Sequence, residues 1–228
     1  MKIIKIIIAT FLVIIGVSNN LVGQIIKGEA LLGLNLSHVQ GDEVSGFKKV
    51  GLNIGAGVLV PFKKNWDVSM EVNYNQKGAR EPDQYHDTDS LGNVTTGAYK
   101  LRLNYVEIPV LIHYTDKEFI TIGGGFSWGR LVGVQEWEHG NIVPTTTLNS
   151  DVYSKNDFSY IVDLRIRIKG PLKFSVRYQS SMAKIRTREF ENVYTGDKWT
   201  RDQYNRVLTF RLIYIFNETQ SKRNKPTE

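Results

Sequence analysis

The sequence contains no cysteine and only four histidines among its 228 residues. The lack of cysteine excludes disulfide bonds, thiolate metal sites, cysteine nucleophiles and a lipid-anchored N-terminal cysteine. The four histidines show no metal-ligand spacing with one another. We therefore expect neither a metal site nor a cofactor.

Long apolar runs are also missing after residue 23, which excludes a helical membrane protein. The one apolar run, at 6–17, follows Lys2 and Lys5 and precedes small residues at 18–23. This order predicts a secretory signal peptide over 1–23. A transmembrane helix is the alternative, but a core of about 12 residues is shorter than the roughly 20 that a span requires.

Positive charge exceeds negative charge by 6, which could indicate a nucleic-acid partner. The basic residues are scattered along the chain, however, and an exported protein rarely meets nucleic acid. We expect no nucleic-acid partner.

Alternation of apolar and polar residues is the dominant pattern. Side chains of a strand point to opposite faces in turn, so alternation indicates a strand with one apolar and one polar side. In the last such segment, Leu208, Phe210 and Leu212 share one face with Tyr214 and Phe216. The eight predicted strands run over 29–38, 50–62, 66–77, 99–114, 118–130, 157–168, 172–181 and 204–216.

The connections between these segments are short and long in turn. Short polar turns lie at 63–65, 115–117 and 169–171, and long polar loops lie near 39–49, 78–98, 131–156 and 182–203. Aromatic residues gather near both ends of the strands, as in the two girdles of a membrane barrel. Residues 24–216 are therefore predicted to form an all-β, eight-stranded antiparallel up-and-down transmembrane β-barrel in the bacterial outer membrane. Residues 217–228 would form a polar periplasmic tail.

The fourth predicted strand changes phase along its length. Tyr99, Leu101 and Tyr105 are apolar at odd positions, whereas Ile108 and Val110 begin an apolar run at even positions. Because proline cannot donate to a sheet ladder, we predict a β-bulge at 107–109, where the phase changes.

The polar face is rich in charged and small residues, which suit the interior of a narrow barrel. Eight strands leave room for little more than side chains. We predict a lumenal ion-pair network with a structural role, built from Glu71, Arg102, Asp163, Arg165, Arg177 and Arg211. A narrow ion or proton path is the functional alternative.

Candidates for catalysis are few. Ser37, His38 and Asp42 could suggest a hydrolase triad, but adjacent strand residues point to opposite faces. His86 lies among Asp83, Asp87 and Asp89 and could bind a divalent cation weakly, although a solvated loop is the simpler interpretation.

Several motifs together resemble the PorT-like outer-membrane β-barrel family. They are Gly33-Leu34-Asn35-Leu36-Ser37, the Gly41-Asp42 pair, 47–55, Asn73-Tyr74-Asn75-Gln76-Lys77-Gly78, the sequence Tyr105-Val106-Glu107-Ile108-Pro109 and the glycine-rich 119–125. The resemblance spans essentially the whole mature chain and implies an eight-stranded outer-membrane barrel. Some members are linked to protein secretion or gliding machinery, and the family offers no catalytic residues to carry over.

We therefore expect a non-enzymatic, monomeric outer-membrane barrel with a closed polar lumen. Its expected partners are outer-membrane lipid and proteins of an envelope or secretion complex, and its role would be envelope integrity or surface interaction. The alternatives are an outer-membrane enzyme acting on lipid or peptide at the loop rim, a narrow small-solute pore and a soluble ligand-binding barrel.

Overall fold

The computed structural model describes residues 26–42, 44, 46–88, 92, 94–191 and 196–218. The predicted signal peptide (1–23) and residues 219–228 of the predicted tail lie outside these residues. Among those described, no helix is long and apolar enough to cross a membrane.

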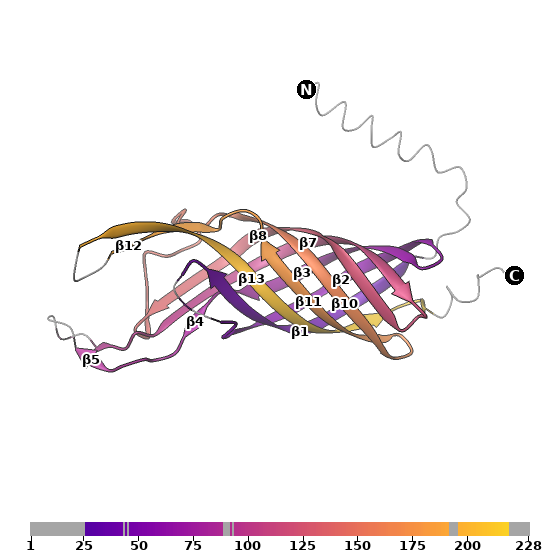
Figure 1. Cartoon of the computed structure of the whole chain (residues 1–228), viewed down its shortest axis with the longest axis horizontal. Helices are drawn as coiled ribbons and strands as arrows, with labels where there is room; N and C mark the ends of the chain where they lie inside the picture. Colours follow the sequence, from indigo (N-terminus) through magenta and orange to yellow (C-terminus); the bar gives the residue numbers. More distant parts are fainter. Residues whose placement is uncertain are drawn as a thin grey trace, which may run out of the picture.

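Eight long strands of the described chain form a closed antiparallel ring (Figure 1). Neighbours in the sequence pair with each other, and β1 closes the ring by pairing with β13 from Glu29–Ile215 to Gln40–Tyr204. The predicted all-β, eight-stranded barrel is confirmed. Its strands are β1 (Lys27–Gln40), β2 (Lys49–Lys63), β3 (Trp66–Lys77), β7 (Tyr99–Asp116), β8 (Ile120–Glu138), β10 (Asn156–Lys169), β11 (Leu172–Ser181) and β13 (Lys198–Ile215).

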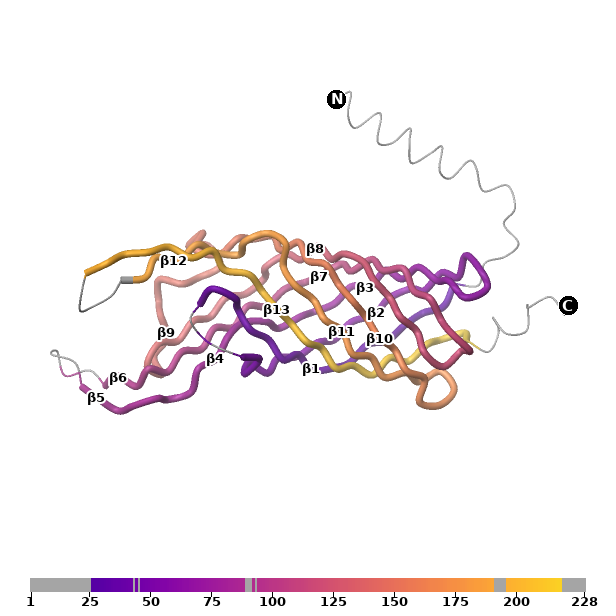
Figure 2. Tube along the Cα trace, viewed as in Figure 1, coloured from indigo at the N-terminus to yellow at the C-terminus, as the bar shows by residue number. Residues whose placement is uncertain are grey.

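The two ends of the barrel differ. The short turns gather at one end, here named the short-turn end, and the long connections gather at the other, the long-loop end (Figure 2). Several strands run past their predicted limits into the long connections: β8 continues to Glu138 and β13 begins at Lys198. Short strands add to this end: β4 (Arg80–Glu81), β5 (Asp87–Thr88), β6 (Val94–Thr95), β9 (Asn141–Ile142) and β12 (Arg186–Glu191).

Even-numbered apolar residues cover the outside of the ring. Leu32 is 55% exposed and Ile122 is 58% exposed, and both belong to a band that surrounds the barrel. Odd-numbered polar residues point inward, where Asn35, Glu71 and Asp163 are fully buried. Such a barrel, apolar outside and polar inside, is suited to a lipid environment.

The predicted bulge at 107–109 is wrong. β7 pairs with β3 in the same register on both sides of this segment, from Tyr114–Trp66 to Val110–Met70 and from Glu107–Asn73 to Leu103–Lys77. The ladder is interrupted at Ile108 and Pro109, but no extra residue is inserted. The irregularity lies against β8, where Asn104 pairs with Gly133 and Tyr105 with Leu131. The odd residues of β7 point inward along the whole strand. The phase of the sequence pattern changes because the interior is polar near Glu107 and apolar near Leu101 and Leu103.

That apolar interior is a plug at the long-loop end. Leu101, Leu103 and Tyr105 of β7 are 0% exposed and pack with residues that the long connections supply. The rest of this buried cluster comprises Val39, Val44, Ala79, Leu131, Tyr153 and Ile185. This cluster closes the barrel at the long-loop end of the polar lumen. Removal of its apolar side chains from water favours the closure.

Candidate functional site

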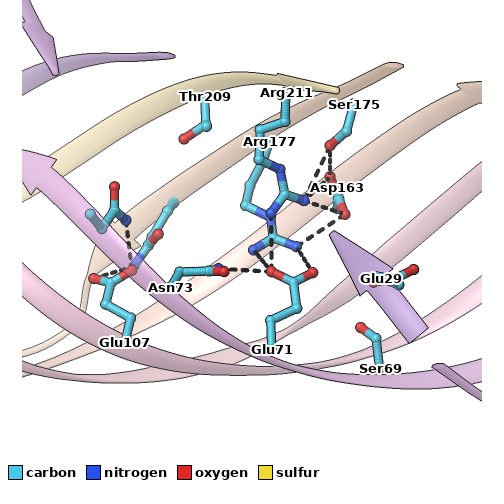
Figure 3. Close-up of polar contacts among 12 residues, drawn as sticks. Glu29, Ser69, Glu71, Asn73, Glu107, Asp163, Ser175, Arg177, Thr209 and Arg211 are labelled. Carbon is cyan, nitrogen blue, oxygen red and sulfur yellow. Dashed lines mark hydrogen bonds and ion pairs between the residues drawn. The ribbon is translucent and has the colours of Figure 1, made fainter. Parts of the chain in front are cut away.

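Glu71 of β3 is the centre of the lumenal charges (Figure 3). Arg177 of β11 donates to both of its carboxylate oxygens, at 2.9 and 2.8 Å. Arg211 of β13 donates to Oε2 at 3.0 Å and Arg165 of β10 donates to Oε1 at 3.0 Å. Asn73 adds a hydrogen bond of 2.8 Å to Oε2. One carboxylate thus links four strands across the lumen.

Asp163 repeats this arrangement beside Glu71. It accepts from Arg165 at 2.8 Å, from Arg177 at 3.1 Å and from Arg211 at 3.2 Å. Ser175 donates to its other oxygen at 2.6 Å. Bidentate and shared arginine contacts of this kind are among the strongest hydrogen bonds in proteins.

Glu29 of β1 completes the charge balance through an ion pair of 2.7 Å with Arg165. This residue is not in the predicted network, although its odd number and inward phase could have indicated it. Three carboxylates (Glu29, Glu71, Asp163) face three guanidinium groups (Arg165, Arg177, Arg211), so the buried cluster has no net charge. Buried charges of either sign are costly unless paired, and this pairing satisfies them.

Arg102 does not join the network. It lies on the outer surface of β7 beyond the apolar band, where it donates to Gln135 at 3.4 Å and lies 5.7 Å from the Trp137 ring. The prediction that Arg102 lies in the lumen is wrong, because it assumed that the polar face of a strand always points inward. On this part of β7 the polar face points outward, because the interior is the apolar plug.

A second buried charge cluster lies between this network and the plug. Lys77 pairs with Glu107 at 2.5 Å and with Asp157 at 3.0 Å. Asn75 and Gln179 also donate to Glu107, at 2.7 and 3.2 Å. Polar side chains therefore fill the lumen in successive layers along the barrel.

Inward glycines make room for these large side chains. A Cβ on Gly55 would lie 2.0 Å from Oδ1 of Asn73, and one on Gly123 would lie 2.2 Å from Nδ1 of His113. Such distances are far inside van der Waals contact. The interior is packed at these positions and leaves no open channel there.

A serine–histidine pair lies in this packed interior. Ser69 Oγ is 2.8 Å from His113 Nε2, and both residues are 0% exposed. Nδ1 of His113 has no hydrogen-bond partner among the described residues, so the acid that would orient a catalytic histidine is missing. Inward positions on neighbouring strands could have indicated this pair from the sequence, and its burial closes it to substrate.

The side chains of the possible triad Ser37, His38 and Asp42 do not converge. Ser37 points inward and donates to the backbone oxygen of Gly78 at 2.9 Å. His38 points outward and packs edge-on against Phe47. Asp42 accepts from the Val44 amide at 3.0 Å instead of facing either. Within the described part of the chain, no group of three or more histidine and carboxylate side chains could hold a metal ion.

A hydrogen-bonded cluster pins the connections at the long-loop end, beyond the apolar band. Glu136 of β8 accepts from Tyr99 at 2.7 Å, from Thr146 at 2.6 Å and from Arg186 at 3.1 Å. Arg186 also donates to Tyr153 at 2.8 Å. β7, β8, β12 and the 139–155 connection thus meet at one carboxylate.

The protonation states of the residues in this cluster fit a structural role better than a role in proton transfer. Burial raises the pKa of Glu136, but hydrogen bonds from Thr146 and Tyr99 and the charge of Arg186 outweigh it and hold that pKa below its usual value. Burial, with Glu136 nearby, raises the pKa of Tyr99, and burial raises the pKa of Tyr153 to about 12. The carboxylate stays ionised and the phenols stay protonated, which leaves no general base near neutral pH.

Comparison with known proteins places these features in a family. The family model described as outer membrane protein beta-barrel domain matches residues 28–186, more than half of the chain. No curated protein matches the sequence.

Solved structures with a similar fold share little sequence. The attachment invasion locus protein Ail of Yersinia pestis is 14% identical, with 83% of this chain and 98% of that chain covered and a TM-score of 0.48. Neisserial surface protein A is 8% identical, with 83% and 96% covered and a TM-score of 0.46. The Escherichia coli outer membrane protease OmpT is 10% identical, with 85% and 97% covered and a TM-score of 0.37. Similarity at these levels carries no argument about activity.

Proposed function

The chain belongs to the outer membrane protein beta-barrel domain family and resides in the bacterial outer membrane, and from this premise we propose that it is a non-enzymatic barrel with a sealed lumen. Its short-turn end would face the periplasm and its long-loop end the exterior, as in barrels of this kind. Its role would be envelope integrity, surface interaction or membership of an envelope or secretion complex.

The ion-pair network around Glu71 is the observation that carries this proposal. It joins β1, β3, β10, β11 and β13 across a lumen that eight strands make only wide enough for side chains. Lys77 with its carboxylates and the apolar plug add two further barriers in series. A solute would have to break paired, desolvated charges to pass, which costs several kcal/mol or more.

The finer assignment to the PorT-like branch draws support from the Tyr105-Glu107-Ile108-Pro109 motif. Tyr105 packs in the plug, Glu107 pairs with Lys77 in the lumen and Ile108 points outward. The motif therefore occupies the boundary between the apolar and polar interiors. This position gives the motif a structural role, which fits a family that offers no catalytic residues.

Surface interaction through the long connections is the role that the architecture favours. The β12–β13 hairpin extends beyond the ring at the long-loop end (Figure 1) and carries a stacked Phe190–Trp199 pair with ring centroids 6.0 Å apart. Arg188 lies 5.2 Å from the Phe190 ring. Aromatic and arginine side chains are enriched at protein interfaces.

Two measurements test the proposal. Proteoliposomes of the purified barrel should swell no faster in small sugars than protein-free liposomes, whereas rapid swelling would indicate a pore. Fluorophosphonate probes for serine hydrolases should leave the folded protein unlabelled. Labelling that depends on Ser69 would show that the buried pair becomes accessible and would favour the enzyme alternative.

A further inference from the structure

The outer surface of β7 and its neighbours changes character where the apolar band ends. Tyr74 of β3 pairs with Val106 of β7, and the next outward pair of these two strands, Gln76 and Asn104, is polar. Arg102 and Lys100 follow on the same face of β7, and Arg80 of β4 lies directly opposite Lys100. We name Arg80, Lys100 and Arg102 the outer basic cluster.

The outer basic cluster lies at the outer edge of the headgroup layer of the outer leaflet. Arg102 is four residues beyond Val106, which is about 10 Å above the band for a strand tilted by about 40°. The polar layer of a bilayer is roughly 5–8 Å thick on each side, and a long arginine side chain can reach back into it. Lys100 and Arg80 lie one strand step further out, at the level of a bulkier headgroup.

These three cations lack the acidic partners that the buried cations of the lumen have. Arg165, Arg177, Arg211 and Lys77 all pair with carboxylates, whereas no member of the outer basic cluster forms an ion pair with a described residue. Like charges directly opposite each other on neighbouring strands destabilise a sheet, so a bound anion would stabilise the Arg80–Lys100 pair. Arg102 Nε is buried without a hydrogen-bond partner among the described residues.

Trp137 gives the cluster an aromatic platform. Lys100 Nζ lies 4.5 Å and Arg102 Cζ lies 5.7 Å from its ring. A surface groove of about 350 Å³ runs past Arg80, Lys100 and Trp137 and is also lined by Glu81 and Asp83. Cations suit a phosphate, an aromatic face suits the apolar side of a sugar ring, and carboxylates accept hydrogen bonds from hydroxyl groups.

We propose that the outer basic cluster and Trp137 bind the phosphorylated sugar headgroup of an outer-leaflet glycolipid. The phosphate is held by Lys100, Arg102 and Arg80, and the sugar lies in the groove against Trp137. The headgroup supplies the anion that the Arg80–Lys100 pair needs and fixes the rotation of the barrel against its lipid neighbours. A sugar phosphate fits better than a small phospholipid headgroup, because the groove lies above the level of Arg102.

The test measures binding of bisphosphorylated lipid A to the full-length folded barrel in detergent by native mass spectrometry and Trp fluorescence. The triple variant Arg80→Gln, Lys100→Gln, Arg102→Gln should bind about tenfold more weakly or worse, the loss expected when charge-assisted contacts are removed. The matched control Lys63→Gln, Lys117→Gln, Lys169→Gln removes the same charge at the short-turn end and should bind as the wild type does. Heat-modifiable gel mobility reports folding of both, and the single variant Lys100→Gln replaces the triple variant if the latter fails to fold.

Competing ligands identify what is recognised. Dephosphorylated lipid A and phosphatidylglycerol should each bind at least about tenfold more weakly than bisphosphorylated lipid A. The proposal is overturned if the triple variant retains wild-type binding or if dephosphorylated lipid A binds equally well. It is also overturned if inorganic phosphate displaces the lipid at equal concentration, since the site would then recognise a free anion.

Discussion

Lys77 and Glu107 form an ion pair of 2.5 Å in the interior of the barrel, and the same ammonium group lies 5.0 Å from the ring centroid of Tyr105. Glu107 and Tyr105 are two residues apart on β7 and point the same way, yet one belongs to the polar lumen and the other to the apolar plug. Lys77 joins the two, because its stem can pack with apolar groups while its charge meets carboxylates.

Replacement of Lys77 by methionine should destabilise the barrel by about 3–5 kcal/mol. The variant keeps the length of the side chain but leaves Glu107 and Asp157 buried without their cation. Urea unfolding from lipid vesicles measures the free energy of unfolding. Lys63→Met, at the exposed end of β2, is the control and should change it by less than about 0.5 kcal/mol. Equal stability of the two variants would show that Glu107 and Asp157 do not need Lys77 as their cation.

A double-mutant cycle on Glu71 and Arg177 should show strong coupling. Glu71→Gln leaves three guanidinium groups short of one counter-charge, and Arg177→Gln alone leaves the carboxylates underpaired, so each costs about 3–5 kcal/mol. The double variant should be more stable than the sum of the two losses by at least about 1 kcal/mol. Simple additivity of the two losses would show that the residues act independently.

The adjacent glycines 123 and 124 form a natural pair of tests. Gly123→Ala places a Cβ 2.2 Å from Nδ1 of His113 and should cost about 1–3 kcal/mol of stability. Gly124→Ala points outward, with its nearest atom 3.8 Å away, and should be neutral or slightly stabilising. The same unfolding experiment compares them, and a Gly124→Ala variant that loses as much as Gly123→Ala would show that inward packing is not the cause.

Much of the barrel could be predicted because alternation reports directly on which face of a strand meets lipid. The predicted strand 66–77 coincides with β3, and the predicted strand 172–181 coincides with β11. Alternation does not say which side of the sheet is the inside. Below Glu107 the polar side faces inward, and beyond Tyr105 the polar side faces outward.

The two wrong predictions for β7, the bulge at 107–109 and the lumenal position of Arg102, arise because alternation does not identify the inner side of the sheet. Arg102 follows the same polar pattern as Lys100 and Asn104, and only the three-dimensional closure of the plug shows that this face is external. The ion pairs among Glu71, Asp163 and three arginines span strands far apart in sequence, so no local pattern could select them. The inward phase of Glu29 could have indicated its place in the lumen, but not its partner Arg165, which lies 136 residues away.

A pH dependence should arise from Asp42 at the long-loop end. Burial raises its pKa from 3.8 to about 7, against the opposing hydrogen bond from the Val44 amide and the charge of Arg188. The folded protein therefore holds this proton more tightly than the unfolded chain does, so the contribution of Asp42 to stability is present below about pH 4 and is lost as the pH rises to about 7.

The Asp42→Asn variant should lack this contribution to the pH dependence of the unfolding free energy. The difference in unfolding free energy between Asp42→Asn and the wild type should grow in favour of the variant from pH 4 to pH 7 and then level off. Asp83→Asn, at an exposed position of the neighbouring connection, is the control. A difference that stays constant across this range would rule out titration of Asp42.

Single-channel recording in planar bilayers tests the sealed lumen most directly. Folded protein, verified by heat-modifiable gel mobility, should give no steady conductance steps above the protein-free bilayer, because paired charges and the apolar plug fill the interior in series. Reproducible conductance steps from the wild-type barrel, reduced when Glu71 or Lys77 is replaced, would contradict a sealed lumen and show that the polar lumen is an ion path.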